Sequence, residues 1–161
     1  MNFKRIISPQ DLSENALSTL ISAFEMAIKF DAKLLIVHAS DELLDEDEET
    51  MLRISLSKFR KHENEVINKI KTSFEKLLTQ HPMVNRSALG DLAARVDYSI
   101  SIISSHGNPG KSLLEYAEKE QVDLIVLSKT GHSSVMEILL GSVSTYILHH
   151  ATCPVLLTPG K

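Results

Sequence analysis

The chain has 161 residues, 43% of them hydrophobic and 24% charged, with a formal net charge of −4 at pH 7. This composition is typical of globular proteins and excludes the disordered and fibrous classes. There is no Trp and no clustered Lys/Arg stripe, which argues against a nucleic-acid partner. The longest apolar runs, such as "LIVL" at 124–127, are far shorter than the roughly 18 residues that span a bilayer, so we expect no membrane segment.

A chain of this length can bury a sufficient core in one domain, so a single domain over residues 1–161 is expected. Cys153 is the only cysteine and cannot form an internal disulfide. The first residues, "MNFKRIISPQD", hold too short an apolar run for a signal peptide. These features predict a cytoplasmic protein.

Short apolar runs alternate with segments of helical periodicity along the chain. Strands are expected at 3–8, 33–39, 99–105, 122–128 and 153–158, and helices at 12–32, 50–80, 111–121 and 142–151. Ser13 is placed to cap the first helix. Because strands joined through helices favour right-handed parallel crossovers, we predict an α/β fold. It consists of an open, mostly parallel five-stranded sheet with helices on both faces.

Two segments are less regular. The acidic run 41–49 holds seven of the 21 acidic residues and is expected as a solvated loop, where negative charge meets the positive end of the following helix. A contact with a metal or a basic partner is the alternative. Segment 81–96 includes "GDLAARV", which could form a short extra helix.

In an open parallel sheet, ligands bind at the carboxyl ends of the strands, near the point where strand order reverses. Three loops follow such ends: 9–13, 105–112 and 128–142. Asp11 in the first could accept a hydrogen bond from a sugar hydroxyl or could shape a helix-capping turn. In the third, Gly131 allows close approach, and Gly141-Ser142 begins a helix whose N–H groups favour an anion. A helix cap after a long loop is the alternative.

The loop "SHGNPGKS" at 105–112 is one residue away from a P-loop, with Ser105 in place of the first glycine and Gly110, Lys111 and Ser112 matching. Pro109 removes an N–H group that would hold phosphate, and "LIVLS" ends without a carboxylate for Mg²⁺. A plain turn is the favoured interpretation. A P-loop-like phosphotransferase that uses Lys111 is the alternative.

Other reactive residues have simpler interpretations. Cys153 has no evident activating base and is expected to be a small buried hydrophobic residue. The seven histidines lack metal-ligand spacing, although His132 follows Gly131 and could contact phosphate or solvent. No Ser/His/Asp group with nucleophile-elbow spacing is present.

Taken together, these segments resemble the universal stress protein family, and the resemblance covers nearly the whole chain. It is carried by "RIISPQDLSENAL", "LLIVHA", "GNPGKSLLEYAEKEQVDLIVLS" and "LLGSVSTYILHHATCPVLLT". The family motif Gly-x-x-Gly-x9-Gly-(Ser/Thr) is matched at Gly131, Gly141 and Ser142, with Ser128 in place of the first glycine and Gln10 where Thr is common. The resemblance implies a Rossmann-like fold of the adenine nucleotide alpha hydrolase type.

The resemblance also implies an adenine-nucleotide site for ATP, ADP or AMP, with or without Mg²⁺. In nucleotide-binding members, the Asp after the first strand contacts ribose, backbone at the ends of the second and fourth strands holds adenine, and the glycine-rich loop surrounds the phosphates. With His132 added from the loop itself, the expected site residues are Pro9, Gln10, Asp11, Ala39, Leu127, Ser128, Gly131, His132, Gly141, Ser142 and Val143.

If the first motif glycine requires positive φ, Ser128 would cost about 1 kcal/mol or more. If that glycine only allows close approach of the nucleotide, a small serine fits.

A homodimer through the C-terminal edge strand "PVLLT" is also implied, since an uncovered apolar edge would favour aggregation. We expect a stress-response sensor or regulator. No clear general base or arginine finger is visible, so any ATP hydrolysis should be slow. The alternative is a dimeric interaction module of the same fold that binds no nucleotide.

Overall fold

The computed structural model describes residues 2–41, 49–80, 96–129 and 140–159, with side chains omitted for 49–59 and 80. Each predicted strand and each of the four main predicted helices is present close to its expected bounds. In chain order the elements are β1 Arg5–Pro9, α1 Glu14–Phe30, β2 Lys33–Ser40, α2 Glu49–Gln80, β3 Tyr98–Ser104, α4 Pro109–Lys119, β4 Leu124–Ser128, α5 Ser142–His150 and β5 Val155–Thr158. The expectations for 42–48 and for a helix within 81–95 lie outside the described residues.

The five strands form one sheet in the order β3-β2-β1-β4-β5, and every neighbouring pair is parallel. The predicted α/β fold is therefore confirmed, with a sheet that is fully parallel. Ile7 at its centre pairs with Leu35 of β2 and with Ile125 of β4. The chain builds outward from β1 first through β2 and β3, then through β4 and β5. Strand order consequently reverses between β1 and β4.

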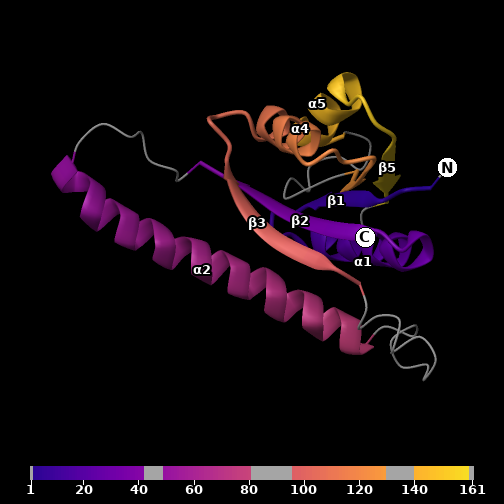
Figure 1. Ribbon diagram of the computed structural model, residues 1–161, viewed down its shortest axis with the longest axis horizontal. Helices are drawn as coiled ribbons and strands as arrows, with labels where there is room; N and C mark the ends of the chain where they lie inside the picture. The colour runs from indigo at the N-terminus through magenta and orange to yellow at the C-terminus, as the bar shows by residue number, and fades with distance from the viewer. Residues whose placement is uncertain (1, 42–48, 81–95, 130–139, 160–161) are drawn as a thin grey trace.

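Helices cover both faces of this sheet (Figure 1). Successive strand residues point to opposite faces, so neighbours in β1 belong to different cores. Ile6 joins the cluster under α1 and α2, whereas Ile7 joins the cluster under α4 and α5. Both isoleucines are almost fully buried. The continuous apolar runs of the strands follow from this two-sided burial.

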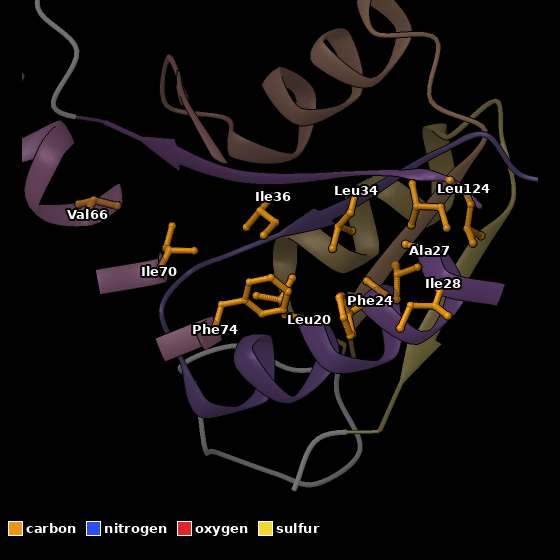
Figure 2. Close-up of a cluster of buried hydrophobic side chains, with 14 residues drawn as sticks. Leu20, Phe24, Ala27, Ile28, Leu34, Ile36, Val66, Ile70, Phe74 and Leu124 are labelled. Carbon is orange, nitrogen blue, oxygen red and sulfur yellow. The ribbon is translucent and has the colours of Figure 1, made fainter. Parts of the chain in front are cut away.

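The larger core lies between the sheet and the α1–α2 layer (Figure 2). Phe24 of α1 and Phe74 of α2 meet edge to face, with ring centroids 5.5 Å apart. Ile70 packs beside them, and all three side chains are at most 1% exposed. Burial of each such side chain contributes about 2 kcal/mol, so these contacts fix the C-terminal half of α2 against the sheet.

Helix α1 begins and ends at residues that suit its termini. Ser13 is the N-cap, and its Oγ accepts from the Ala16 N–H at 3.1 Å, as predicted. Asp31 ends the helix in the left-handed conformation, with φ of 51°. The start of α1 is thereby fixed directly after the end of β1.

Helix α2 is much longer than any strand and extends past the end of the sheet (Figure 1). Charged and polar residues are frequent along it, for example in "RKHENE" at 60–65. No helix in the described ranges has the length and hydrophobicity needed to cross a membrane.

Candidate functional site

A cavity of about 280 Å³ opens at the carboxyl ends of β1, β2 and β4, where strand order reverses. Nine of the residues expected from the sequence line it: Pro9, Gln10, Asp11, Ala39, Leu127, Ser128, Gly141, Ser142 and Val143. The remaining two, Gly131 and His132, lie outside the described residues. The topology thus brings together three segments that are far apart in sequence.

Sequence reasoning missed several residues that line the same cavity, among them His38, Pro109, Leu113, Ser144 and Ile147. The apolar members belong to α4 and α5, which close the cavity from one face of the sheet. The sequence predicted helices over 111–121 and 142–151. It could not indicate that α4 and α5 meet over the ends of β1 and β4.

The backbone of β2 presents polar groups to the cavity. In a parallel ladder the N–H and C=O of one residue point to the same neighbouring strand, and this direction alternates along the chain. Val37 accepts from the Gln10 N–H at 2.8 Å on the β1 side, whereas Leu34 donates to the Asp97 carbonyl at 2.9 Å on the β3 side. Ala39 lies two residues after Val37 in β2, so its backbone groups point in the same direction as those of Val37. Its N–H and C=O therefore point to the β1 side, beyond the end of β1.

The residues after β1 shape the wall next to Ala39. An Asp11 carboxylate oxygen accepts from the Ser13 N–H at 3.0 Å and from the Ser13 hydroxyl at 2.5 Å. Gln10 is 3% exposed, and its Nε2 donates to the Ser8 hydroxyl at 3.1 Å and to the Ala16 carbonyl at 3.2 Å. Asp11 therefore shapes the helix-capping turn and lines the cavity at once. The two interpretations of Asp11 are compatible.

His38 joins the same wall from β2. Its Nδ1 lies 2.7 Å from the backbone oxygen of Gln10. This contact ties the end of β2 to the segment that follows β1.

Ser128 is the last residue of β4, where its Cα is paired with that of Thr158. Positive φ occurs at four described residues other than glycine, Leu12, Asp31, His106 and Gln121, and Ser128 is not one of them. Its carbonyl accepts from the buried Ser144 hydroxyl of α5 at 2.8 Å. Ser128 thus adopts an ordinary strand conformation, and the cost expected for a left-handed serine does not arise.

Gly141 is the N-cap of α5, with φ of −62° and ψ of 156°, and no side chain caps this helix end. The N–H of this N-cap residue donates to the Lys129 carbonyl at 3.1 Å. The next residues, Ser142 and Val143, line the cavity. First-turn N–H groups have no partner within a helix and lie at its positive end, so this wall suits an anion.

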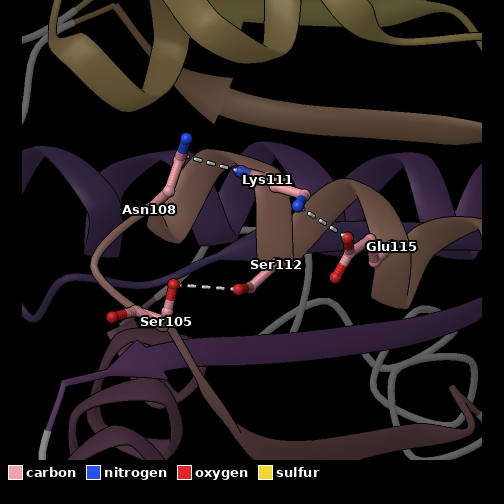
Figure 3. A network of polar contacts seen from close by, with 5 residues as sticks. All are labelled: Ser105, Asn108, Lys111, Ser112 and Glu115. Atoms are coloured by element: carbon pink, nitrogen blue, oxygen red, sulfur yellow. Dashed lines mark hydrogen bonds and ion pairs between the residues drawn. The ribbon is translucent and has the colours of Figure 1, made fainter.

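The loop 105–112 has another role (Figure 3). Ser105 is buried, and its hydroxyl donates to Asp41 while its carbonyl accepts from the Ser112 hydroxyl at 3.0 Å. The side chain of Asn108 caps α4 by accepting from the Lys111 N–H at 3.1 Å. Lys111 itself forms an exposed 3.7 Å ion pair with Glu115. These contacts support the turn interpretation and argue against the P-loop alternative.

Gly110 of this loop serves helix packing. A Cβ atom built at Gly110 would lie 2.9 Å from Cβ of Tyr146, closer than such atoms approach in proteins. The glycine therefore lets α4 lie directly against α5. This contact accounts for the glycine without any phosphate.

Cys153 is half-buried in the cluster under α4 and α5. Burial raises the pKa of its thiol, and the nearby Asp123 carboxylate raises the pKa further, while a backbone hydrogen bond partly opposes them. The neutral thiol is therefore favoured. Cys153 was expected to be buried and is only half-buried, although it does pack among hydrophobic residues as expected.

Among the residues that the structure describes, no three His, Cys, Asp or Glu side chains lie close enough together to hold a metal ion. A magnesium ion at the cavity would depend largely on phosphate oxygens and water for its ligands, as is usual for this ion.

Comparison with known proteins agrees with this architecture. The family model "Universal stress protein family" matches residues 2–159. Universal stress protein MJ0577 from Methanocaldococcus jannaschii is 27% identical over 99% of this chain and 96% of its own length. The solved structure of MJ0577 superposes with a TM-score of 0.71 at 24% identity, covering 100% of this chain and 99% of that one.

Two further similar structures were solved as nucleotide complexes. A universal stress protein in complex with cAMP has a TM-score of 0.61 at 19% identity, and each chain is covered completely. The universal stress protein from Archaeoglobus fulgidus in complex with dAMP has a TM-score of 0.57 at 14% identity, with 98% of each chain covered. At these identities the likeness establishes the fold. With the family model matched over nearly its whole length, this chain belongs to the universal stress protein family.

Proposed function

We propose that this protein binds an adenine nucleotide in the cavity at the ends of β1, β2 and β4, and that it acts as a stress-response sensor or regulator. The observation that carries the proposal is the direction of the Ala39 backbone. Its N–H and C=O point past the end of β1 on the cavity wall. A backbone donor beside a backbone acceptor complements the edge of adenine, which offers the N1 acceptor next to the amino donor.

The rest of the cavity suits the sugar and phosphates. Asp11 offers a carboxylate acceptor to ribose hydroxyls at the wall next to Ala39. Across the cavity, the first turn of α5 around Ser142 offers N–H groups to phosphate oxygens. The cAMP and dAMP complexes of similar universal stress proteins support the same ligand class. ATP, ADP and AMP are the candidates, with Mg²⁺ accompanying the phosphates of ATP or ADP.

The described residues of the cavity wall lack the cationic groups of a rapid phosphotransferase. Asp11 and His38 are the titratable residues among the described ones that line it, and neither Lys nor Arg is included. An arginine or lysine that neutralises transferring phosphate is a main source of rate in such enzymes. Regulation by nucleotide occupancy, with slow hydrolysis at most, fits this wall better than fast turnover.

We further propose a homodimer through β5. Val155–Thr158 forms an edge of the sheet, with Leu156 36% exposed, and Leu148 on the neighbouring α5 is 39% exposed. Pairing with a second copy would satisfy the open edge and cover these side chains. A cytoplasmic location, suggested by the single cysteine, is part of the same proposal.

Calorimetric titration with ATP, ADP and AMP, each with and without Mg²⁺, tests the binding proposal. We expect saturable binding by the wild type, and loss of binding in Gly141→Val, because Gly141 lines the cavity directly before the first turn of α5 and valine adds bulk there. Lys111→Ala is the matched control and should bind as well as the wild type, since Lys111 pairs with Glu115 on the surface.

Absence of heat and of any thermal shift at millimolar nucleotide would reject nucleotide binding. A stable dimer by light scattering, together with that result, would favour the interaction module instead. Loss of binding in Lys111→Ala would restore the P-loop alternative.

A further inference from the structure

We propose that His38 is a specificity-determining residue of the cavity, whose Nε2 accepts a hydrogen bond from a donor group of the bound nucleotide. The inference rests on the proposed function and adds a residue that neither the sequence motif nor the family resemblance indicated.

The contact with Gln10 determines the tautomer of the ring. Nδ1 of His38 lies 2.7 Å from a backbone carbonyl oxygen, which can only accept. Nδ1 must therefore carry a hydrogen. In the neutral imidazole Nε2 then has no hydrogen and is an acceptor.

The backbone ladder explains why the Gln10 carbonyl is available to the ring. Gln10 directs its N–H to Val37 of β2, so its carbonyl also points to β2, where the next rung would use the Ala39 N–H. That rung is not among the backbone hydrogen bonds of the described residues. The imidazole of His38 donates to this carbonyl instead. The ring thus lies against Gln10, which directly follows β1. Both His38 and Ala39 are among the residues that line the cavity.

His38 is only half-buried, so a ligand in the cavity can reach the ring. Within the described part of the chain, no hydrogen bond or ion pair is formed by Nε2. An acceptor such as Nε2 favours ligands that can donate a hydrogen bond to it. Adenine nucleotides carry donors of two kinds, the exocyclic amino group of the base and the hydroxyl groups of the ribose. Both would satisfy Nε2, whereas a keto oxygen or a missing hydroxyl would not.

Two substitutions distinguish the roles of the two ring nitrogens of His38. The amide nitrogen of Asn stands as far from the backbone as Nδ1, so His38→Asn keeps a donor to the Gln10 carbonyl and removes the acceptor. The terminal group of Gln stands near the position of Nε2, so His38→Gln keeps an acceptor and removes the Nδ1 contact. The wild type and both variants are titrated with nucleotide at pH 8. The ligands are ATP, 2′-deoxy-ATP, 3′-deoxy-ATP and ITP.

We expect the wild type to bind ATP about tenfold more tightly than one of the three analogues. The group that this analogue lacks is then the donor to Nε2 of His38. His38→Asn should lose this preference, and His38→Gln should keep it. A preference against ITP assigns the amino group, and a preference against one deoxy analogue assigns the corresponding hydroxyl.

An unchanged preference in His38→Asn would overturn the inference, as would an equal loss of affinity for all four ligands, which a merely structural role would produce. A wild type that binds ATP without any preference also overturns it and leaves the proposed function intact. No binding by the wild type overturns both.

A direct readout does not depend on the variants. In wild-type protein with ¹⁵N-labelled histidine, ATP should change the chemical shift of the His38 Nε2 while Nδ1 remains protonated. A resonance that stays unchanged at saturation would reject the contact.

Discussion

Two substitutions test the backbone conformation of Ser128. A strand conformation and a left-handed conformation predict opposite signs for the difference in the free energy of unfolding between Ser128→Gly and Ser128→Ala. The residue ends β4 opposite Thr158 and does not have positive φ. Ser128→Ala and Ser128→Gly both remove the hydroxyl and differ only in Cβ. In a strand, glycine is roughly 0.5–1 kcal/mol less favourable than alanine. We therefore expect Ser128→Gly to be less stable than Ser128→Ala by that amount.

Urea unfolding followed by circular dichroism measures this difference in the free energy of unfolding. A left-handed backbone would reverse the order, because alanine would then be about 1–2 kcal/mol less favourable than glycine. A more stable Ser128→Gly would refute the strand conformation at this site. The two variants should also bind ATP with similar affinity, and a large gain in affinity on Ser128→Gly alone would show that the Cβ atom obstructs the ligand.

Three further substitutions or reactions test other parts of the structure. Gly110→Ala should lower the free energy of unfolding by about 1–3 kcal/mol through the contact with Tyr146 and leave ATP binding unchanged, measured by urea unfolding and calorimetry; a loss of affinity with full stability would indicate a ligand role. Ser13→Ala should lower the free energy of unfolding by about 1 kcal/mol, because the N-cap hydrogen bond of α1 is lost. An unchanged urea midpoint would contradict this expectation. Because burial raises the pKa of Cys153, its thiol should react with a disulfide reagent much more slowly at pH 8 in the native protein than in urea, and equal rates would show an exposed thiol.

Much of the fold could be predicted because it depends on local signals. The helical spacing of apolar residues in α1 and the capping residue Ser13 act within a few residues of each other, and the structure has both. The apolar runs of the strands predicted a sheet covered on both faces. Asp11 could be assigned to the site because parallel strands end at the same edge of the sheet, and Ala39 was added through the family resemblance.

Other features depend on contacts between distant segments. The role of His38 follows from the end of β1 next to β2, which no spacing in the sequence reveals. Gly110 was recognisable as part of a phosphate-loop pattern, yet its reason is the approach of Tyr146 from α5. The Gly141 N–H donates to the Lys129 carbonyl, a contact between the two ends of a long loop that no local pattern indicates. Each of these depends on how elements meet in three dimensions.

The most direct test of nucleotide binding at the strand ends is a titration of ¹⁵N-labelled protein with ATP, followed through the backbone amide resonances. We predict the largest shifts at Asp11, Ala39 and Ser142, which lie on the cavity wall, and little change at Lys111 on the outer face of α4. Shifts centred on Lys111, or spectra that do not change at millimolar ATP, would contradict the central claim.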